Sequence, residues 1–362
     1  MLRARWGRVR AVLVETARRQ ELEVEVEGRI ERAIAYSDLT GRVRPGDRVW
    51  LNTTAVELGL GTGGYHFVIA APGRAPGPGR GHFMKLRYTP FQVRVEVLED
   101  LLAPLPEGLD GLPVVVAELH SQLAPVLAGW WWAGGRGPAV YVATEGGALP
   151  LAFSRLVERL RRRGWLQFTI TAGQAFGGDG EAINVASALL CARALGASLA
   201  VVTMAPGVLG SGSALGHSGI EQAWALQVAA QLGGRALAVP RLSAADPRPR
   251  HRGLSHHTAA VLGLIGRPVW LPLPRALPRQ VTAALARLAA AAGCVPVEVP
   301  TAGAAAWLAA SGIGAESMGR DLAADPLFFH AGLAAGIAAA AAGRHQGREG
   351  HVGEHPAQRD GL

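Results

Sequence analysis

Residues Leu199–Pro240 read LAVVTM, APGVLGSGSALGHSG, IEQAWALQVAAQL, GGR and ALAVP in order along the chain. The first and last blocks are short, continuous apolar runs, which are typical of strands buried on both faces of a sheet. The third block has the length and apolar spacing of a helix, and glycine-rich segments flank it. A buried strand, a helix and a second buried strand predict two parallel strands joined by a helical crossover.

The same alternation continues over residues 109–342, where we predict an α/β domain with a mostly parallel sheet and helices on both faces. The expected strands are Val114–Ala117, Val140–Ala143, Phe168–Thr171, Leu199–Met204, Ala236–Pro240, Val269–Leu273 and Val295–Val299. The expected helices include Leu149–Arg162, Ile183–Leu195, Ile220–Leu232 and Gln280–Ala292.

Residues 1–103 have a different pattern, in which apolar and polar residues alternate in short runs. These runs are Val9–Val14, Leu22–Val26, Ile30–Tyr36, Arg48–Leu51 and Tyr65–Ala70. They predict a small N-terminal β-barrel-like domain, with a Pro/Gly loop at residues 71–81. A further strand, Gln92–Leu98, either closes this barrel or leads out of it. Residues 343–362 are polar and aperiodic, and we predict a disordered tail there.

Composition narrows the classes of function. The net charge is +8, but Lys85 is the only lysine, so an arginine-rich composition explains the basic balance and argues against a nucleic-acid partner. The two cysteines lie in apolar runs, which excludes a disulfide framework. The N-terminus lacks a secretory signal, and the Ala/Gly-rich segment Pro326–Gly343 is more typical of a core helix than of a membrane span. We expect a cytoplasmic protein without a membrane segment. The sequence leaves open whether the protein forms a homo-oligomer.

Segments that follow the predicted strands carry most of the groups that bind or transfer protons. They are His120–Gln122, Thr144–Gly147, Gln174–Asp179, Pro206–Ser218 and Arg241–Thr258. Because parallel strands end at one edge of a sheet, these segments are expected to converge on a ligand site. The catalytic candidates are His120, Glu145, Asp179, His256 and His257. The substrate-binding candidates are Ser121, Gln122, Gln174, Gly177, Gly178, His217, Arg248, Arg250 and His251.

Several of these residues also have a structural interpretation. Asp179 is placed to cap the helix that follows it, and Ser218 with Glu221 matches a capping box. Ser255 is expected to cap a helix whose first turn holds His256 and His257. Arg248, Arg250 and Arg252 alternate, so in an extended chain they would form a clamp for phosphate or carboxylate. The glycine-rich run Gly207–Gly216 either presents amides to an anion or forms a lid.

No cofactor motif is evident. His120 is placed to meet His251, His256 or His257 around a divalent metal, although no HxH or HExxH spacing is present. A single lysine argues against PLP chemistry and P-loop phosphate binding. The GxGxxG match at Gly59–Gly64 leads into a strand rather than a helix, which argues against a classical dehydrogenase.

The leading hypothesis is an enzyme, a hydrolase or group transferase, that acts on a small anionic and possibly phosphorylated substrate. In it the histidines transfer protons, Glu145 and Asp179 are their carboxylate partners, and Arg248 and Arg250 hold the anion. The alternative is a non-catalytic regulatory protein that binds a metabolite or RNA. Trp130–Trp132 adds a third interpretation, an aromatic patch for assembly or an interface between the two domains.

Several unusual strings together carry a resemblance to a known family. They are Leu51–Phe67, Met84–Pro90, His120–Pro125, Gly146–Pro150, Gly173–Gly178, Asp246–Gly253 and Ser255–Thr258. With them the chain, from Trp6 to about His330, resembles a bacterial family catalogued as domain of unknown function 3866. The resemblance implies no reaction and no site residue. It does draw attention to Gly61–Phe67 and to Lys85, Arg87 and Tyr88. These segments are either a glycine-rich hairpin and a basic strand edge, or they lend His66 or Arg87 to the same cleft.

Overall fold

The computed structural model describes residues 2–61 and 63–349. Its N-terminal part is a closed barrel of five strands in the order β1-β2-β3-β5-β4, which confirms the barrel predicted from the alternating pattern. The strands are β1 (Ala4–Glu15), β2 (Arg19–Val26), β3 (Arg29–Tyr36), β4 (Arg48–Asn52) and β5 (Tyr65–Ala70). Two short helices, α1 (Ser37–Thr40) and α2 (Thr54–Glu57), connect them.

A two-stranded ribbon leads from the barrel to the rest of the chain. It pairs β6 (Phe83–Lys85) with β7 (Val93–Val95), so the predicted strand at Gln92–Leu98 leads out of the barrel. Lys85 is buried, and its ammonium donates to the carbonyls of Thr171 and Ala175 and to the Glu181 carboxylate at 2.7–2.8 Å. All three donors of the only lysine are therefore satisfied, and they tie the ribbon to the sheet.

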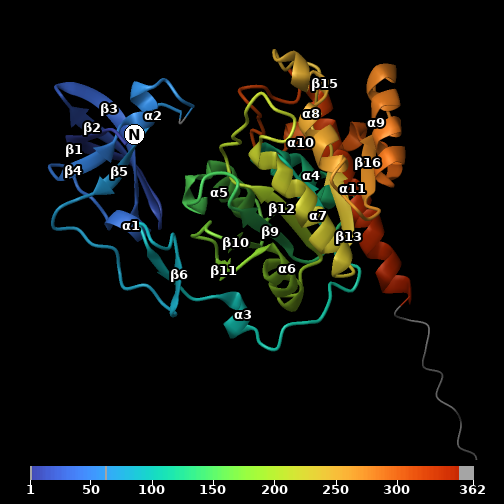
Figure 1. Ribbon diagram of the computed structural model, residues 1–362, viewed down its shortest axis with the longest axis horizontal. Coiled ribbons are helices and arrows are strands. Elements are labelled where there is room, and N and C mark those ends of the chain that lie inside the picture. Colours follow the sequence, from blue (N-terminus) through green and yellow to red (C-terminus); the bar gives the residue numbers. More distant parts are fainter. Residues whose placement is uncertain (1, 62, 350–362) are drawn as a thin grey trace, which may run out of the picture.

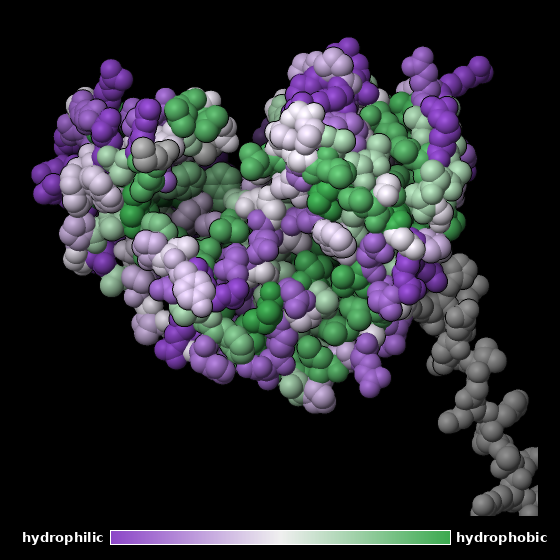
Figure 2. Space-filling view, viewed as in Figure 1, coloured by the Kyte–Doolittle hydropathy of each residue, from purple (hydrophilic) through white to green (hydrophobic). Residues whose placement is uncertain are grey.

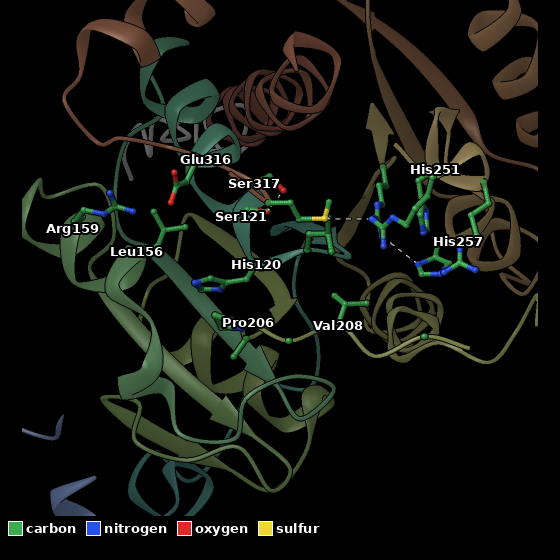
Figure 3. A pocket seen from close by; sticks show the side chains of 18 residues that line it. His120, Ser121, Leu156, Arg159, Pro206, Val208, His251, His257, Glu316 and Ser317 are labelled. Atoms are coloured by element: carbon green, nitrogen blue, oxygen red, sulfur yellow. Dashed lines mark hydrogen bonds between the residues drawn. The ribbon is translucent and has the colours of Figure 1, made fainter. Parts of the chain in front are cut away.

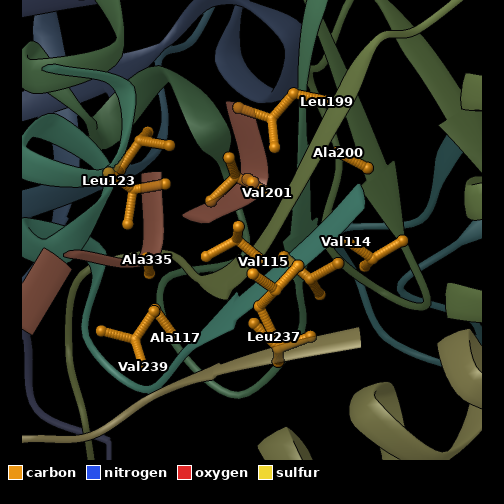
Figure 4. Close-up of a cluster of buried hydrophobic side chains, with 14 of the residues drawn as sticks. Val114, Val115, Ala117, Leu123, Leu199, Ala200, Val201, Leu237, Val239 and Ala335 are labelled. Atoms are coloured by element: carbon orange, nitrogen blue, oxygen red, sulfur yellow. The ribbon is translucent and has the colours of Figure 1, made fainter. Parts of the chain in front are cut away.

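The second part contains one sheet of eight parallel strands in the order β11-β10-β9-β12-β8-β13-β16-β17, which confirms the predicted α/β fold. The strands are β8 (Pro113–Ala117), β9 (Ala139–Thr144), β10 (Phe168–Ala172), β11 (Gly180–Ala182), β12 (Leu199–Met204), β13 (Arg235–Val239), β16 (Trp270–Pro274) and β17 (Val295–Val299). Every residue of β8, β9 and β12 is buried, as their continuous apolar runs indicate. Figure 4 shows side chains of β8 and β12 in this core, among them Val115 and Val201.

Helices cover both faces of this sheet (Figure 1). The first strand of this sheet along the chain, β8, lies near its middle, and β9, β10 and β11 follow towards one edge. The chain then returns to β12, which lies between β9 and β8, and β13, β16 and β17 continue towards the other edge. Because such crossovers are right-handed, helices of the two directions lie on opposite faces. The helices are α3 (Leu98–Leu101), α4 (Leu123–Trp132), α5 (Arg155–Arg162), α6 (Val185–Ala194), α7 (Glu221–Gln231), α8 (His256–Leu262), α9 (Arg279–Ala292), α10 (Ala302–Ala310) and α11 (Pro326–Glu349).

Short elements fill the loops at the carboxyl end of the sheet. They are the 3-10 turns η1 (His120–Gln122), η2 (Leu151–Phe153), η3 (Ser218–Ile220) and η4 (Pro249–His251), and the ribbon of β14 (Leu242–Ser243) with β15 (Gly253–Leu254). The helix predicted over Leu149–Arg162 is shorter than expected, because Ser154 caps α5 by accepting from the Val157 amide.

Helix α11 is the one helix in the described residues that is long and apolar enough to cross a membrane, and 67% of its Pro326–Arg344 window is buried. It packs on β8, β13 and β16 and against α4, as the core helix of a soluble protein does. It continues to Glu349, so the aperiodic tail predicted from residue 343 is wrong over its first seven residues. Residues 350–362 of that predicted tail lie outside the described part.

The aromatic run Trp130–Trp132 ends α4. Trp130 is buried, and the Trp131 indole donates to the Trp165 carbonyl at 2.9 Å. Trp131 is partly buried and Trp132 is 42% exposed, so only the first part of the run belongs to the interior of the α/β part. The contacts of Trp130 and Trp131 lie within the α/β part, and the expectation of an interface between the two domains is wrong. The barrel instead contacts the segment around α5: Arg155 pairs with Glu21, and Arg19 lies 3.3 Å from Glu158. Figure 2 shows the surface hollowed between the two parts.

Close approach of α4 and α11 depends on glycine. A Cβ atom at Gly336 would overlap the Val126 carbonyl oxygen and the Trp130 amide of α4. We predict that Gly336→Ala lowers the free energy of unfolding by about 2 kcal/mol, since overpacking typically costs roughly 1–3 kcal/mol. Urea unfolding checks this. On the same helix Gly343→Ala is the control, because its Cβ would have only an ordinary contact with Trp130. Equal stabilities of the two variants would contradict the packing argument.

Candidate functional site

A cavity of about 470 Å³ lies at the carboxyl ends of β12, β8 and β13. These strands flank the point where the strand order reverses, which is where open α/β sheets bind ligands. In Figure 3, His120 and Ser121 lie in the middle of the cavity, Leu156 and Arg159 on one side, and His251 and His257 on the other. The convergence of segments predicted from the sequence therefore holds for three of the five: those after β8, β12 and β13.

Behind the cavity lies a buried network centred on Glu118, the first residue after β8. Its side chain is 1% exposed, and Oε1 accepts from Arg241 Nη1 at 2.8 Å and from His257 Nδ1 at 2.6 Å. Burial alone would raise the pKa of this carboxyl, but the hydrogen bond from His257 and the charge of Arg241 hold it below its usual value. Glu118 is therefore an anion that fixes one arginine and one imidazole.

Four histidines gather beside this carboxylate. The rings of His217 and His257 are stacked, with centroids 3.6 Å apart and an angle of 2° between planes. His256 and His251 lie 4.3 and 4.8 Å from His257, at 58° and 86° to it. Ser255 caps α8 by accepting from the His257 amide, which confirms the predicted cap and places His256 and His257 in the first turn.

Each of three rings has one nitrogen engaged at Nδ1. His257 Nδ1 contacts Glu118, His251 Nδ1 contacts Ser255 Oγ at 2.8 Å, and His256 Nδ1 contacts the Arg250 carbonyl at 3.2 Å. Hydrogen bonds of this kind set the tautomer and leave the Nε2 lone pair free to act. Burial lowers the pKa of His251 to about 3, so this ring is neutral at pH 7.

His217 differs from the other three rings. It is 7% exposed, and in the described residues neither of its nitrogens has a hydrogen-bond partner. Its pKa is lowered to about 4, mainly by burial. Buried polar atoms without partners are rare, and each costs roughly 1–3 kcal/mol. The ligand atoms of His251, His256 and His257 lie within 4.8 Å of one another, as do those of Glu118, His217 and His257.

One glycine makes room for this cluster. A Cβ at Gly219 would lie 2.7 Å from the Glu118 side chain and 3.0 Å from His217 Nδ1. At Gly210, by contrast, a Cβ would lie 3.7 Å from His257 Nε2, which is an ordinary contact. The glycine-rich run Gly207–Gly216 folds back on itself, with the Ser211 amide donating to the Gly216 carbonyl at 2.7 Å. Gly207, Val208 and Gly210 line the cavity, and the residues from Leu209 to Gly216 are exposed.

The predicted capping box at this loop is not formed. Ser218 Oγ accepts from the Leu209 amide at 3.1 Å, and Glu221 reaches Thr144 instead of an amide of its own helix. The reason is that η3 precedes α7, so the helix begins two residues later than the box requires.

The arginines do not form the expected extended clamp, because η4 turns the chain between them. Arg248 makes a bidentate pair with buried Asp246, with both distances 2.9 Å. Arg250 lines the cavity, and in the described chain no carboxylate lies within the 4.0 Å of an ion pair to its guanidinium. Arg252 does not line the cavity, since its Nε donates to the Asp246 carbonyl at 3.3 Å. Arg159 from α5 also lines it, and its buried Nε has no partner.

The segment after β8 supplies three of the predicted residues. His120 lines the cavity, but Tyr141 lies 3.1 Å from its Nδ1 and Ser154 2.7 Å from its Nε2. Burial lowers the pKa of His120 to about 4. Ser121 lines the cavity and donates to Ser317. Gln122 is buried and accepts from the Leu119 amide, which is a structural role.

The segments after β9 and β10 hold the remaining predicted residues, which lie outside the cavity. Glu145 accepts from the Gln174 amide at 2.6 Å, and the Gln174 side chain accepts from the Leu86 amide. Asp179 pairs with Arg161 and accepts from Thr169; the helix cap expected of it is supplied by Asn184.

Gly177 and Gly178 pack in the same turn, where their amides donate to Glu181 and Thr171. Nor does any described residue of the barrel line the cavity. His66 binds Glu31 at 2.6 Å within the barrel, and Arg87 does not line the cavity.

Sequence reasoning missed three residues of the site, namely Glu118, Arg241 and Asp246. All three are buried and directly follow strands or lie in the loop after β13. The available signal was their position: a carboxylate or guanidinium placed immediately after a buried apolar strand needs a partner at that sheet edge.

The carboxyl group of Glu221, at the same edge of the sheet, gives a testable prediction of pH-dependent stability. Burial, with the charge of Glu145 adding to it, raises the pKa of Glu221 to about 7, against a hydrogen bond from Thr144. The folded state thus favours the protonated Glu221 carboxyl. This preference stabilises the fold fully below pH 4.5, and the stabilisation is lost as the pH rises through 7. We predict that Glu221→Gln is more stable than the wild type above pH 7, by on the order of 1–2 kcal/mol after allowing for partial exposure.

Urea unfolding at a series of pH values from about 5 to 9 measures this difference. The control is Glu298→Gln on β17, whose carboxylate is exposed. If the Glu221→Gln variant kept the pH dependence of the wild type, the assignment of the raised pKa would be wrong.

Among the comparisons with known proteins, the one with protein families gives a match. Residues 32–336 match the model of a family described as "Protein of unknown function (DUF3866)". The match begins within β3 and ends within α11, so it takes in part of the barrel and the whole sheet. No curated protein and no solved structure matches the chain.

Proposed function

Because the chain belongs to the DUF3866 family, a membership that carries no assigned activity, we propose from its site that the protein is an enzyme acting on a small anionic substrate. The reaction class is hydrolysis or group transfer, and the substrate carries a phosphate or carboxylate. One observation carries the proposal: a single cavity joins arginines that have no carboxylate partner among the described residues to imidazoles held in place by hydrogen bonds.

Charge on the cavity wall favours an anion. The lining residues include four arginines and one glutamate: Arg159, Arg241, Arg248, Arg250 and Glu316. Arg241 and Arg248 are neutralised by Glu118 and Asp246 behind the wall. Arg250 and Arg159 have no carboxylate partner among the described residues, although Arg159 also donates to the Gly314 carbonyl at 3.2 Å. These two therefore carry the anion-binding role, since hydrogen bonds between a guanidinium and an anion are strong.

The imidazoles on the wall are the groups that act on the bound substrate. His257 is held by Glu118, the carboxylate partner that the sequence analysis sought in Glu145 and Asp179. His251 is the second ring that faces the cavity. We assign no base role to His120, because the hydroxyl groups of Tyr141 and Ser154 are hydrogen-bonded to its two ring nitrogens. A cytoplasmic location and a bacterial source remain predictions from the sequence.

We predict that Arg250→Ala weakens binding of inorganic phosphate about tenfold, which corresponds to about 1.4 kcal/mol and to the loss of one charged hydrogen bond. A thermal-shift titration with phosphate, sugar phosphates and small carboxylates measures it, since a bound ligand raises the Tm. Arg252→Ala is the matched control, an exposed arginine of the same loop that lies outside the cavity. Equal affinities of wild type and Arg250→Ala would contradict the anion site.

A second assay separates the enzyme from the regulatory protein. Chromogenic phosphate and carboxylate esters are offered to the wild type and to Arg250→Ala. Turnover with a KM raised by Arg250→Ala supports the enzyme. Anion binding without turnover of any ester contradicts it and favours a metabolite sensor, whereas RNA binding that weakens steeply with salt favours the RNA-binding alternative.

A further inference from the structure

The cluster of histidines is more than a set of acid–base groups. Four imidazoles and one carboxylate lie together, and several of their polar atoms have no hydrogen-bond partner. In the described residues these atoms are both His217 nitrogens, His256 Nε2 and Glu118 Oε2. Protein interiors rarely leave this many polar atoms unsatisfied in one place, because each carries a desolvation cost.

The hydrogen bonds on the far side of three rings have the pattern of metal ligands. A ligating histidine almost always donates its other ring nitrogen to a carboxylate, carbonyl or similar acceptor, which fixes the tautomer. His257 has Glu118 in this position, His256 has the Arg250 carbonyl, and His251 has Ser255 Oγ. Three Nε2 lone pairs are thereby directed away from their anchors.

The spacing of the rings also fits one ion. Nitrogens on a tetrahedral zinc ion lie roughly 3.3 Å apart, because Zn–N bonds measure roughly 2.0–2.1 Å. The ligand atoms of His251, His256 and His257 are within 4.8 Å of one another, so small side-chain rotations close the distance. Their planes differ by 44° to 86°, as rings that converge on one point from different sides must.

We propose that His217, His251, His256 and His257 hold a single divalent transition-metal ion of the zinc class. An imidazole-only set favours Zn²⁺, Co²⁺, Ni²⁺ or Cu²⁺ over Mg²⁺ and Ca²⁺, which require oxygen ligands. His217 joins by tilting out of its stack with His257. Glu118 and Arg241 stay outside the set and orient His257.

The ion deepens the proposed function, and its role in turnover rests on that proposal. His251 and His257 line the same cavity as Arg250 and Arg159, so an ion held there faces the anion-binding wall. With the ion bound, His251 and His257 would hold it and would no longer transfer protons themselves. The ion would supply a Lewis acid, provided that an oxygen of the phosphate or carboxylate enters as a fifth ligand. Binding of the ion itself is independent of any reaction.

Full-length protein stripped with a chelator and titrated with Co²⁺ tests the site. We expect one Co²⁺ per chain, the visible absorption of a four-coordinate cobalt complex, and displacement by Zn²⁺. His256→Gln and His217→Gln should each lower the affinity by more than about a hundredfold, because even outer-shell partners are worth roughly 10–100-fold.

The control is His66→Gln in the barrel, which removes a histidine that is likewise buried and bonded to a glutamate at 2.6 Å. Thermal melting of each metal-free variant shows whether it is folded. Stoichiometric binding that survives His256→Gln in a folded protein would overturn the proposal, as would weak, non-stoichiometric binding to the wild type.

The two proposals fail in different ways. Tight binding of Co²⁺ without turnover of any ester retains the metal site and overturns the enzyme. Turnover by chelator-treated protein, unchanged when Zn²⁺ is added, retains the enzyme and overturns the catalytic role of the ion.

Discussion

The buried carboxylate of Glu118 is the interaction on which the site depends. It follows β8, the central strand, and holds Arg241 from the loop after β13 and His257 from α8. Breaking a buried ion pair typically costs roughly 3–5 kcal/mol, because a charge is left without its partner. Three segments that are far apart in the chain are thus fixed at one point of the sheet edge.

The surrounding charges follow from that constraint. Arg241 reaches towards Asp246, which binds Arg248 with both oxygens, so the loop after β13 is held by alternating charges. These carboxylates pair with Arg241 and Arg248. The guanidinium of Arg250 has no carboxylate partner in the described residues and lines the cavity. Burial meanwhile keeps His217 and His251 neutral. The cavity therefore places a positive wall beside the histidine cluster, and the proposals of an anion site and a metal site rest on this arrangement.

Much of the fold could be predicted from periodicity, because strands buried on both faces leave continuous apolar runs. All seven predicted strands of the sheet are present, and only β11, a three-residue Gly-Glu-Ala strand, gave no such signal. The loop holding His251, His256 and His257 could be placed at the sheet edge for the same reason. The sequence could not show which strand ends become neighbours. Glu145 and Asp179 follow β9 and β10, which lie to one side of the sheet, whereas Glu118 follows the central strand β8. The prediction therefore assigned the carboxylate partner of His257 to the wrong strand ends.

The adjacency of His256 and His257 and the absence of HxH spacing argued against a metal in the sequence, since neighbouring residues rarely point at one ion. Their position in the first turn of α8, beside η4 and His217, brings the rings together through tertiary structure instead. X-ray absorption at the zinc edge of zinc-loaded protein tests this account most directly. We predict a nitrogen first shell with the outer scattering of at least three imidazoles. A shell of oxygen atoms without imidazole scattering would contradict it.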